Sequence, residues 1–273
     1  MAVYTALDRK TVQGLVKDYG FGRLSTAKGI PAGSVNTHYY LEFPKGKFFL
    51  KIDEVKSEEE VQLELDLLLF LRKRGIPCPR PVTDKHGRYL RSYQEKAVSI
   101  YRNIAGKAFS EQTLTSAHLE KIGQALAQLH LVGQEYDKSI PNRFSFERLQ
   151  ALYHNLRGSI AGHLKHIPHV LDDEIAYQEE YREEKLPKGI IHGDLFPDNV
   201  LFRGAKVTGV LDFEAACSGK FIYDLATVVN AMCYHEDHYH IDRFDALLHG
   251  YQSERTLTLA EWDAFPNELR FSA

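Results

Sequence analysis

The sequence predicts an α+β fold in two lobes: a small antiparallel-sheet lobe with one helix, then a larger, mainly helical lobe. Up to residue 102, short apolar runs of strand type alternate with turn residues, and one long helical pattern interrupts them. Beyond residue 103 helical periodicity predominates. No repeat and no low-complexity linker divides the 273 residues, so we expect lobes at 1–102 and 103–273.

The elements of the first lobe follow from periodicity and turn residues. An amphipathic pattern near the N-terminus predicts a short helix that ends at Gly20. The turn at 44–46 separates two apolar runs, 40–43 and 48–52, which we expect to pair as antiparallel strands. Two further strands are expected at 89–92 and 97–101.

Residues 57–75 carry the clearest helix signal. Ser57 is the expected N-cap, Glu60 stands in the capping-box position, and Gly75 marks the end. In the second lobe, helical periodicity covers 116–132, 145–164 and 172–184. The apolar, turn-rich stretch 189–213 predicts a strand, a loop, a hairpin and a strand.

Composition and charge narrow the functional classes. Hydrophobic residues make up 44% of the chain and charged residues 26%, which is ordinary for a globular protein and excludes wholesale disorder. Thirty-four basic against 37 acidic residues give a net charge of −3, which argues against charge-driven binding of nucleic acid or membranes. The three cysteines suit a reducing compartment, and neither a signal peptide nor a membrane span is indicated. We therefore expect a cytoplasmic protein.

The strongest chemical signal lies in residues 192–199. Asp194 is followed five residues later by Asn199, on a predicted loop between strands. In phosphoryl transfer, such an Asp accepts the proton of the attacking hydroxyl, and the Asn carbonyl oxygen binds Mg²⁺. Asp212 follows the apolar run 207–211 and is a natural second Mg²⁺ ligand. The alternative without chemistry is a pair of Asx turns.

Lys51 lies inside an apolar strand and therefore needs a polar partner. Glu64 on the following helix can hold it, in the ion pair that kinases use near nucleotide phosphates, while Glu60 and Asp66 are rival partners. The plain structural alternative is a lysine that faces solvent. In the glycine-containing loop 29–34, backbone N–H groups can approach phosphates.

Two other features are weaker. His235, His238 and His240 suggest a metal site, but their spacing does not put all three on one helical face, so we expect a solvated polar segment. Cys217 and Cys233 are interpreted as small buried hydrophobic residues, since no activating base is evident nearby.

Over essentially the whole chain, these residues resemble the aminoglycoside phosphotransferase superfamily, small-molecule relatives of the protein kinases. The continuation Ala216–Gly219, after Asp212, is most similar to the homoserine kinases of the bacterial threonine pathway. The resemblance implies a protein-kinase-like fold, with ATP and Mg²⁺ in a cleft between the lobes and L-homoserine as the acceptor. It implies Asp194 as the base, Asn199 and Asp212 as metal ligands, and, at the nucleotide, Lys51, Glu64, Gly33 and Ser34.

Two alternatives stay open. A kinase of the same fold can act on choline, ethanolamine or an aminoglycoside, although the basic segment 142–170 argues against a polycationic acceptor. The other is a catalytically impaired nucleotide-binding relative. Similar homoserine kinases run longer, so the second lobe is expected to be truncated or shortened after Ala273. Asp224 is expected to brace the catalytic loop, and the oligomeric state is not predicted.

Overall fold

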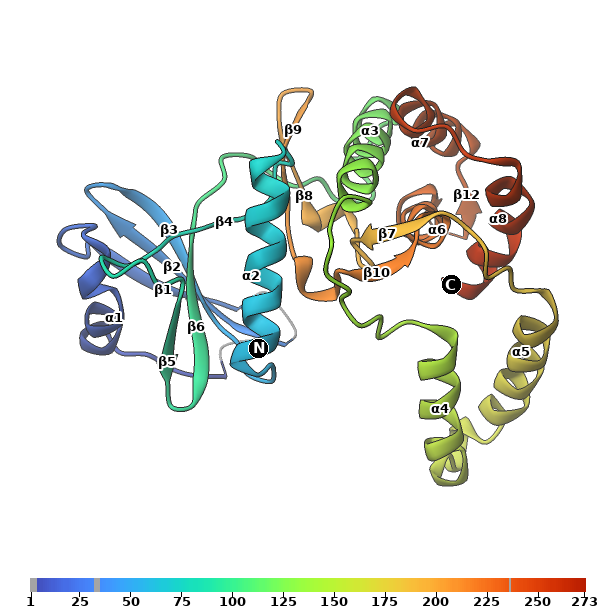
Figure 1. The fold of residues 1–273 in the computed structure, drawn as a ribbon, viewed down its shortest axis with the longest axis horizontal. Coiled ribbons are helices and arrows are strands. Elements are labelled where there is room, and N and C mark those ends of the chain that lie inside the picture. Colours follow the sequence, from blue (N-terminus) through green and yellow to red (C-terminus); the bar gives the residue numbers. More distant parts are fainter. Residues whose placement is uncertain (1–3, 32–34, 236) are drawn as a thin grey trace. The chain divides into compact units, whose positions relative to one another are not determined.

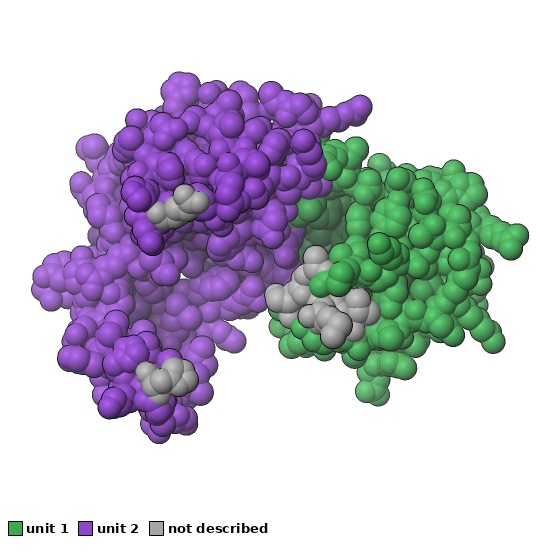
Figure 2. Space-filling view, turned by 180° about the vertical axis from the view of Figure 1, so that it is seen from behind, with its two compact units in different colours: residues 1–106, 208–211 green, residues 107–207, 212–273 purple. Residues whose placement is uncertain are grey.

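The computed structural model describes residues 4–31, 35–235 and 237–273. The chain forms two compact units, drawn in different colours in Figure 2. Unit 1 comprises residues 1–106 and 208–211, and unit 2 comprises residues 107–207 and 212–273. The assignment of nucleotide binding to 1–102 and of catalysis to 103–273 stays a prediction.

Unit 1 is built on an antiparallel sheet with the strand order β1-β2-β3-β6-β4, and β5 pairs with β6. The predicted pairing of 40–43 with 48–52 is confirmed, with Tyr40 opposite Phe49. Both strands are longer than predicted: β3 begins at the tight turn at Gly46, and residues 37–39 of β2 extend the ladder opposite residues 50–52. The strands are β1 (Thr26–Ile30), β2 (Thr37–Phe43), β3 (Gly46–Ile52), β4 (Arg80–Pro81), β5 (Leu90–Tyr93) and β6 (Lys96–Arg102).

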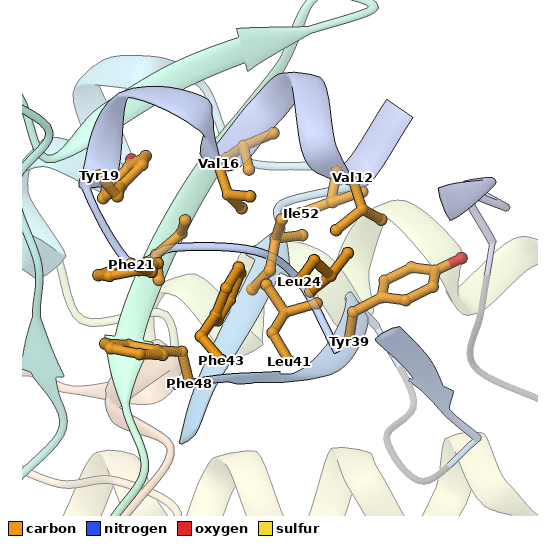
Figure 3. Close-up of a cluster of buried hydrophobic side chains, with 13 residues drawn as sticks. Val12, Val16, Tyr19, Phe21, Leu24, Tyr39, Leu41, Phe43, Phe48 and Ile52 are labelled. Carbon is orange, nitrogen blue, oxygen red and sulfur yellow. The ribbon is translucent and has the colours of Figure 1, made fainter. Parts of the chain in front are cut away.

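Two helices lie on opposite sides of this sheet (Figure 1), and side-chain alternation along β3 decides what each one meets. Phe48, Leu50 and Ile52 point into a buried cluster with α1 (Arg9–Val16), shown in Figure 3. Lys51, between Leu50 and Ile52, faces the other way and contacts Glu64 of α2 (Glu58–Lys73). The capping box of Ser57 predicted for α2 is confirmed. A 3₁₀ turn, η1 (Lys17–Tyr19), follows α1.

Unit 2 is mainly helical. Its helices are α3 (Ser116–Gly133), α4 (Phe146–Leu156), α5 (Ile167–Tyr181), α6 (Phe221–Cys233), α7 (Ile241–Glu254) and α8 (Leu259–Phe271). Helices α3 and α7 lie side by side (Figure 1), with a glycine of each at the crossing. A Cβ on Gly123 would lie 2.2 Å from the carbonyl oxygen of Leu247, and one on Gly250 would lie 2.0 Å from that of Glu120. Only glycine permits this backbone approach.

Short strand pairs complete unit 2. The strands β7 (Lys188–Ile191) and β10 (Cys217–Lys220) form an antiparallel pair. In the sequence they flank residues 192–216, which carry Asp194, Asn199 and Asp212. Strands β8 (Val200–Arg203) and β9 (Lys206–Val210) form the predicted hairpin, in which β9 also contributes residues to unit 1. None of the helices in the described part of the chain is long and apolar enough to cross a membrane.

Three segments differ from prediction. Helix α5 begins at Ile167 instead of residue 172, because Pro168 suits the first turn of a helix. The stretch 145–164 is not one helix: α4 ends at Leu156 and the 3₁₀ turns η2 (Arg157–Ser159) and η3 (Gly162–Leu164) follow. The helical geometry assumed for the histidines at 235–240 is wrong, because β11 (Tyr234–His235) and β12 (His238–Tyr239) pair there.

Candidate active site

In unit 1, Lys51 is buried, with 4% of its surface exposed, and contacts two carboxylates. Its Nζ lies 3.0 Å from Oε1 of Glu64 and 3.4 Å from Oδ1 of Asp53. The rival partners are engaged elsewhere: Glu60 caps α2, and Asp66 accepts a hydrogen bond from Gln62. Lys51 is therefore not the solvent-facing strand residue of the alternative interpretation.

Glu64 also contacts a second lysine. Nζ of Lys56 lies 2.7 Å from Oε2 of Glu64, so each carboxylate oxygen meets one ammonium group. A carboxylate held on both sides cannot turn freely, and it fixes the position of the Lys51 ammonium at the sheet face. Such a fixed ammonium can bind a phosphate oxygen. Gly33 and Ser34, the other predicted nucleotide contacts, lie outside the described residues.

In unit 2, Asp194 and Asn199 share the loop between β7 and β8. The backbone carbonyl of Asp194 accepts a hydrogen bond of 2.9 Å from Nδ2 of Asn199 and one of 3.1 Å from the backbone N–H of Phe196. Because the amide nitrogen of Asn199 is directed at Asp194, its carbonyl oxygen points away from that bond and can serve as a ligand. This amide orientation fits the predicted role of Asn199 towards Mg²⁺.

The segment that follows β9 packs on the same loop. The rings of His192 and Phe213 lie 4.9 Å apart, and Phe213 directly follows Asp212. Asp212 adopts the left-handed conformation, with φ 58°, at the start of the 3₁₀ turn η5 (Phe213–Ala215). An uncommon backbone conformation of this kind is typical of functional sites. A carboxylate and an amide oxygen, completed by phosphate oxygens, are donors that Mg²⁺ prefers.

Gly193, next to Asp194, has φ 75°, and its neighbours leave little room. A Cβ placed on it would lie 3.0 Å from the carbonyl oxygen of Ala215 and 3.3 Å from Cε2 of Phe144. The loop therefore depends on glycine both for its backbone conformation and for its packing. The η4 turn (Pro197–Asn199) then leads the loop into β8.

Asp224 of α6 braces the loop, as predicted. It is fully buried, and its Oδ2 and Oδ1 accept the backbone N–H groups of His192 at 2.7 Å and Gly193 at 2.8 Å. Nε2 of His130, on α3, lies 3.0 Å from Oδ2. Sequence reasoning does not single out His130, although a histidine on the apolar stripe of a helix was a usable signal.

A pocket of about 140 Å³ lies beside the loop, since Phe144 in its wall is the same residue that approaches Gly193. The aromatic residues Phe144, Phe146, Tyr223 and Phe271 line it. Its wall carries equal numbers of basic and acidic side chains, which are Arg182, Lys188 and Lys220, and Glu147, Glu184 and Glu268.

Comparison with known proteins shows which proteins this sequence is similar to. The phosphotransferase enzyme family matches residues 26–264. A homoserine kinase of Parvibaculum lavamentivorans is 34% identical over 275 residues, which cover 100% of this chain and 85% of that protein. A homoserine kinase of Brucella anthropi is 32% identical over 275 residues, with 100% and 84% covered.

Solved structures share the fold at lower identity. The amicoumacin kinase hAmiN superposes with a TM-score of 0.78 at 16% identity, covering 97% of this chain and 83% of that one. The microcompartment-associated aminopropanol kinase gives a TM-score of 0.73 at 20% identity, covering 97% and 86%. These matches confirm the predicted α+β, kinase-like architecture. The chain belongs to the phosphotransferase enzyme family.

Proposed function

We propose that this protein is an ATP-dependent homoserine kinase, which converts L-homoserine and ATP to O-phospho-L-homoserine and ADP. The observation that carries the proposal is the similarity to homoserine kinases along the whole chain, at 34% identity with 85% of the relative covered. The candidate residues for phosphoryl transfer are all present, which argues against a catalytically impaired relative.

In this proposal, Asp194 is the catalytic base. Its carboxylate orients the acceptor hydroxyl and takes its proton while the hydroxyl oxygen bonds to the γ-phosphorus and the bond to the ADP oxygen breaks. Its backbone is restrained through Asn199, and the two preceding N–H groups are held by Asp224. The protein's contribution is mainly positioning, since the transition state needs little covalent help.

Asn199 and Asp212 are the proposed ligands of Mg²⁺, and Lys51, held by Glu64, the proposed partner of the nucleotide phosphates. When bound, the metal ion neutralises phosphate charge as the phosphoryl group transfers. The amicoumacin kinase hAmiN supports a nucleotide and a divalent cation in this fold, since its structure is a complex with AMP-PNP and Ca²⁺.

The pocket beside the loop favours a small acceptor over an antibiotic. At about 140 Å³ it is smaller than the pockets of roughly 300–1,000 Å³ that take drug-sized ligands. Its charged side chains largely pair with one another, Arg182 with Glu147 and Glu184 and Lys220 with Glu268, so the wall lacks the acidic surface that a polycation requires.

A coupled ADP-release assay tests the proposal. The purified protein is given Mg²⁺-ATP with L-homoserine, L-serine, L-threonine, choline, ethanolamine or an aminoglycoside, and kcat/KM is compared across the panel. We expect homoserine to be the best acceptor, with O-phospho-L-homoserine identified by mass spectrometry. Turnover of another acceptor in the absence of homoserine turnover would contradict the acceptor while leaving the kinase chemistry intact.

A further inference from the structure

A chain of buried hydrogen bonds continues from the brace of the catalytic loop into α7 and α8. Nδ1 of His130 lies 2.7 Å from the hydroxyl of Tyr251, and that hydroxyl accepts a hydrogen bond of 3.1 Å from Arg255. Arg255 forms an ion pair of 2.9 Å with Glu261. His130, Tyr251 and Glu261 are 0% exposed and Arg255 is 8% exposed, so water does not compete for these bonds.

Each hydrogen bond in this chain has one possible direction. Burial lowers the pKa of His130, so its imidazole is neutral. Burial alone would raise the pKa of Asp224, but its hydrogen bonds from His130 and from the backbone of His192 lower it, so it stays a carboxylate that can only accept. Nε2 of His130 must therefore carry the proton, and Nδ1 must accept from the hydroxyl of Tyr251.

Arg255 fixes the direction of the hydrogen bond at the Tyr251 hydroxyl. Burial raises the pKa of Tyr251, so the hydroxyl keeps its proton for His130. A guanidinium only donates, so the bond between Arg255 and Tyr251 runs towards the phenol oxygen. Arg255 thus donates to Tyr251, Tyr251 donates to His130, and His130 donates to Asp224.

We propose that Tyr251 and Arg255 are positioning residues of the phosphoryl transfer: the Tyr251 hydroxyl, held by Arg255, fixes the orientation of the His130 ring, and the ring, through Nε2–H, holds the Asp224 carboxylate against the backbone that aims Asp194. The proposal rests on the phosphotransferase function argued above. No contact with substrate is assigned to either residue, because both act through His130 and Asp224.

Packing holds the residues of this hydrogen-bond chain in place independently of their hydrogen bonds. The close approach at Gly123 and Gly250 sets α7 against α3, and Tyr251 directly follows Gly250. The guanidinium of Arg255 lies 4.8 Å from the ring of Phe221, which in turn stacks on His130 at 4.5 Å. Loss of the Tyr251 hydroxyl alone should therefore change the hydrogen bonding of His130 much more than the packing.

Tyr251→Phe is the direct test, because it keeps the ring and removes only the hydroxyl. Nδ1 of His130 then loses its donor, so the ring keeps its Nε2–H bond to Asp224 but is no longer fixed at its other nitrogen, and it holds the Asp224 carboxylate less firmly. We expect kcat to fall between about tenfold and a hundredfold, the scale of a small misplacement of a catalytic group. KM for ATP should stay within about twofold, since Lys51 and Glu64 are untouched.

The pH profile separates this role from a structural one. Besides Asp224, the ionisable groups around His130 are Tyr251 from α7, Arg255 after α7 and Glu261 from α8. In Tyr251→Phe, protonation of His130 makes its Nε2–H a stronger donor to Asp224, so part of the lost kcat should return as the pH is lowered below about 6.5, the value from which burial lowers this pKa. The unmodified enzyme should show no such recovery.

The control is Tyr39→Phe. Tyr39 is also a buried tyrosine, 6% exposed, and its hydroxyl accepts a hydrogen bond of 2.7 Å from the backbone of Leu7 in unit 1. This variant should lose stability with kcat and pH profile unchanged. Arg255→Lys, which keeps a donor and a charge, should retain more activity than Arg255→Met.

A readout without any acceptor keeps this proposal distinct from the acceptor assignment. ¹⁵N NMR of histidine-labelled protein should show His130, assigned from the missing signal in His130→Gln, as the Nε2–H tautomer, and a shifted Nδ1 signal in Tyr251→Phe, where the hydrogen bond from the phenol is lost. A proton on Nδ1 in the unmodified protein would overturn the proposal. So would a Tyr251→Phe variant that folds and matches the unmodified enzyme in kcat and pH profile.

Discussion

Replacing Gly193 by alanine tests whether the backbone before Asp194 has to be where the structure puts it. Gly193 and Gly204 both have positive φ, at 75° and 60°. An alanine in this region costs roughly 1–2 kcal/mol, and this cost is common to both sites. Only at Gly193 does the new methyl group meet other atoms, 3.0 Å from the carbonyl oxygen of Ala215, whereas at Gly204 nothing lies within 4 Å.

The difference in the free energy of unfolding between Gly193→Ala and Gly204→Ala therefore measures the cost of the close contact at residue 193 alone. Overpacking costs about 1–3 kcal/mol, so Gly193→Ala should lower the free energy of unfolding by that much more than Gly204→Ala. A shift of the backbone away from Ala215 carries the adjacent Asp194 with it, so kcat should fall by up to about a hundredfold. Gly204→Ala, at an exposed hairpin turn, should leave kcat unchanged.

Urea unfolding followed by circular dichroism gives the free energies, and the ADP-release assay gives kcat. Equal losses of stability in the two variants, together with equal kcat, would refute the reasoning. A loss of stability in Gly193→Ala at unchanged kcat would show that Asp194 does not depend on this backbone position.

Further predictions concern the reacting groups and the pH response. Asp194→Ala should lower kcat by about 10²–10⁴-fold with little change in ATP affinity by calorimetry, and near-normal kcat would exclude Asp194 as the base. Asp212→Asn, which tolerates the same backbone conformation, should raise the Mg²⁺ concentration for half-maximal rate at least about tenfold; an unchanged Mg²⁺ titration would remove Asp212 as a ligand. Since burial lowers the pKa of His130 from 6.5, the unfolded chain binds the proton more tightly, so stability should fall as the pH drops below about 6.5, by at most about 1.4 kcal/mol per pH unit from this residue. In urea unfolding between pH 5 and 7, His130→Gln should lack this part of the slope, and identical slopes would contradict a neutral His130.

Much of the local structure could be predicted because its causes are local. The capping box at Ser57 and the turn at Gly46 depend on residues close together in the chain. Alternation along β3 likewise makes Lys51 face away from the apolar cluster of its neighbours. Periodicity did not locate the start of α5, where Pro168 in the first turn overrides it.

The sequence by itself determined which residue types are available for chemistry: an Asp and an Asn five residues apart, a strand-end Asp and a lysine within an apolar strand. Tertiary structure decided which side chains meet. Glu64 was one of three candidate partners for Lys51, and only the packing of α2 on the sheet selected it. His130 and Tyr251 are 121 residues apart, and they touch because two glycines let α3 and α7 approach backbone to backbone. Periodicity indicates that a face is buried, but the partner of a buried polar group depends on contacts that are remote in sequence.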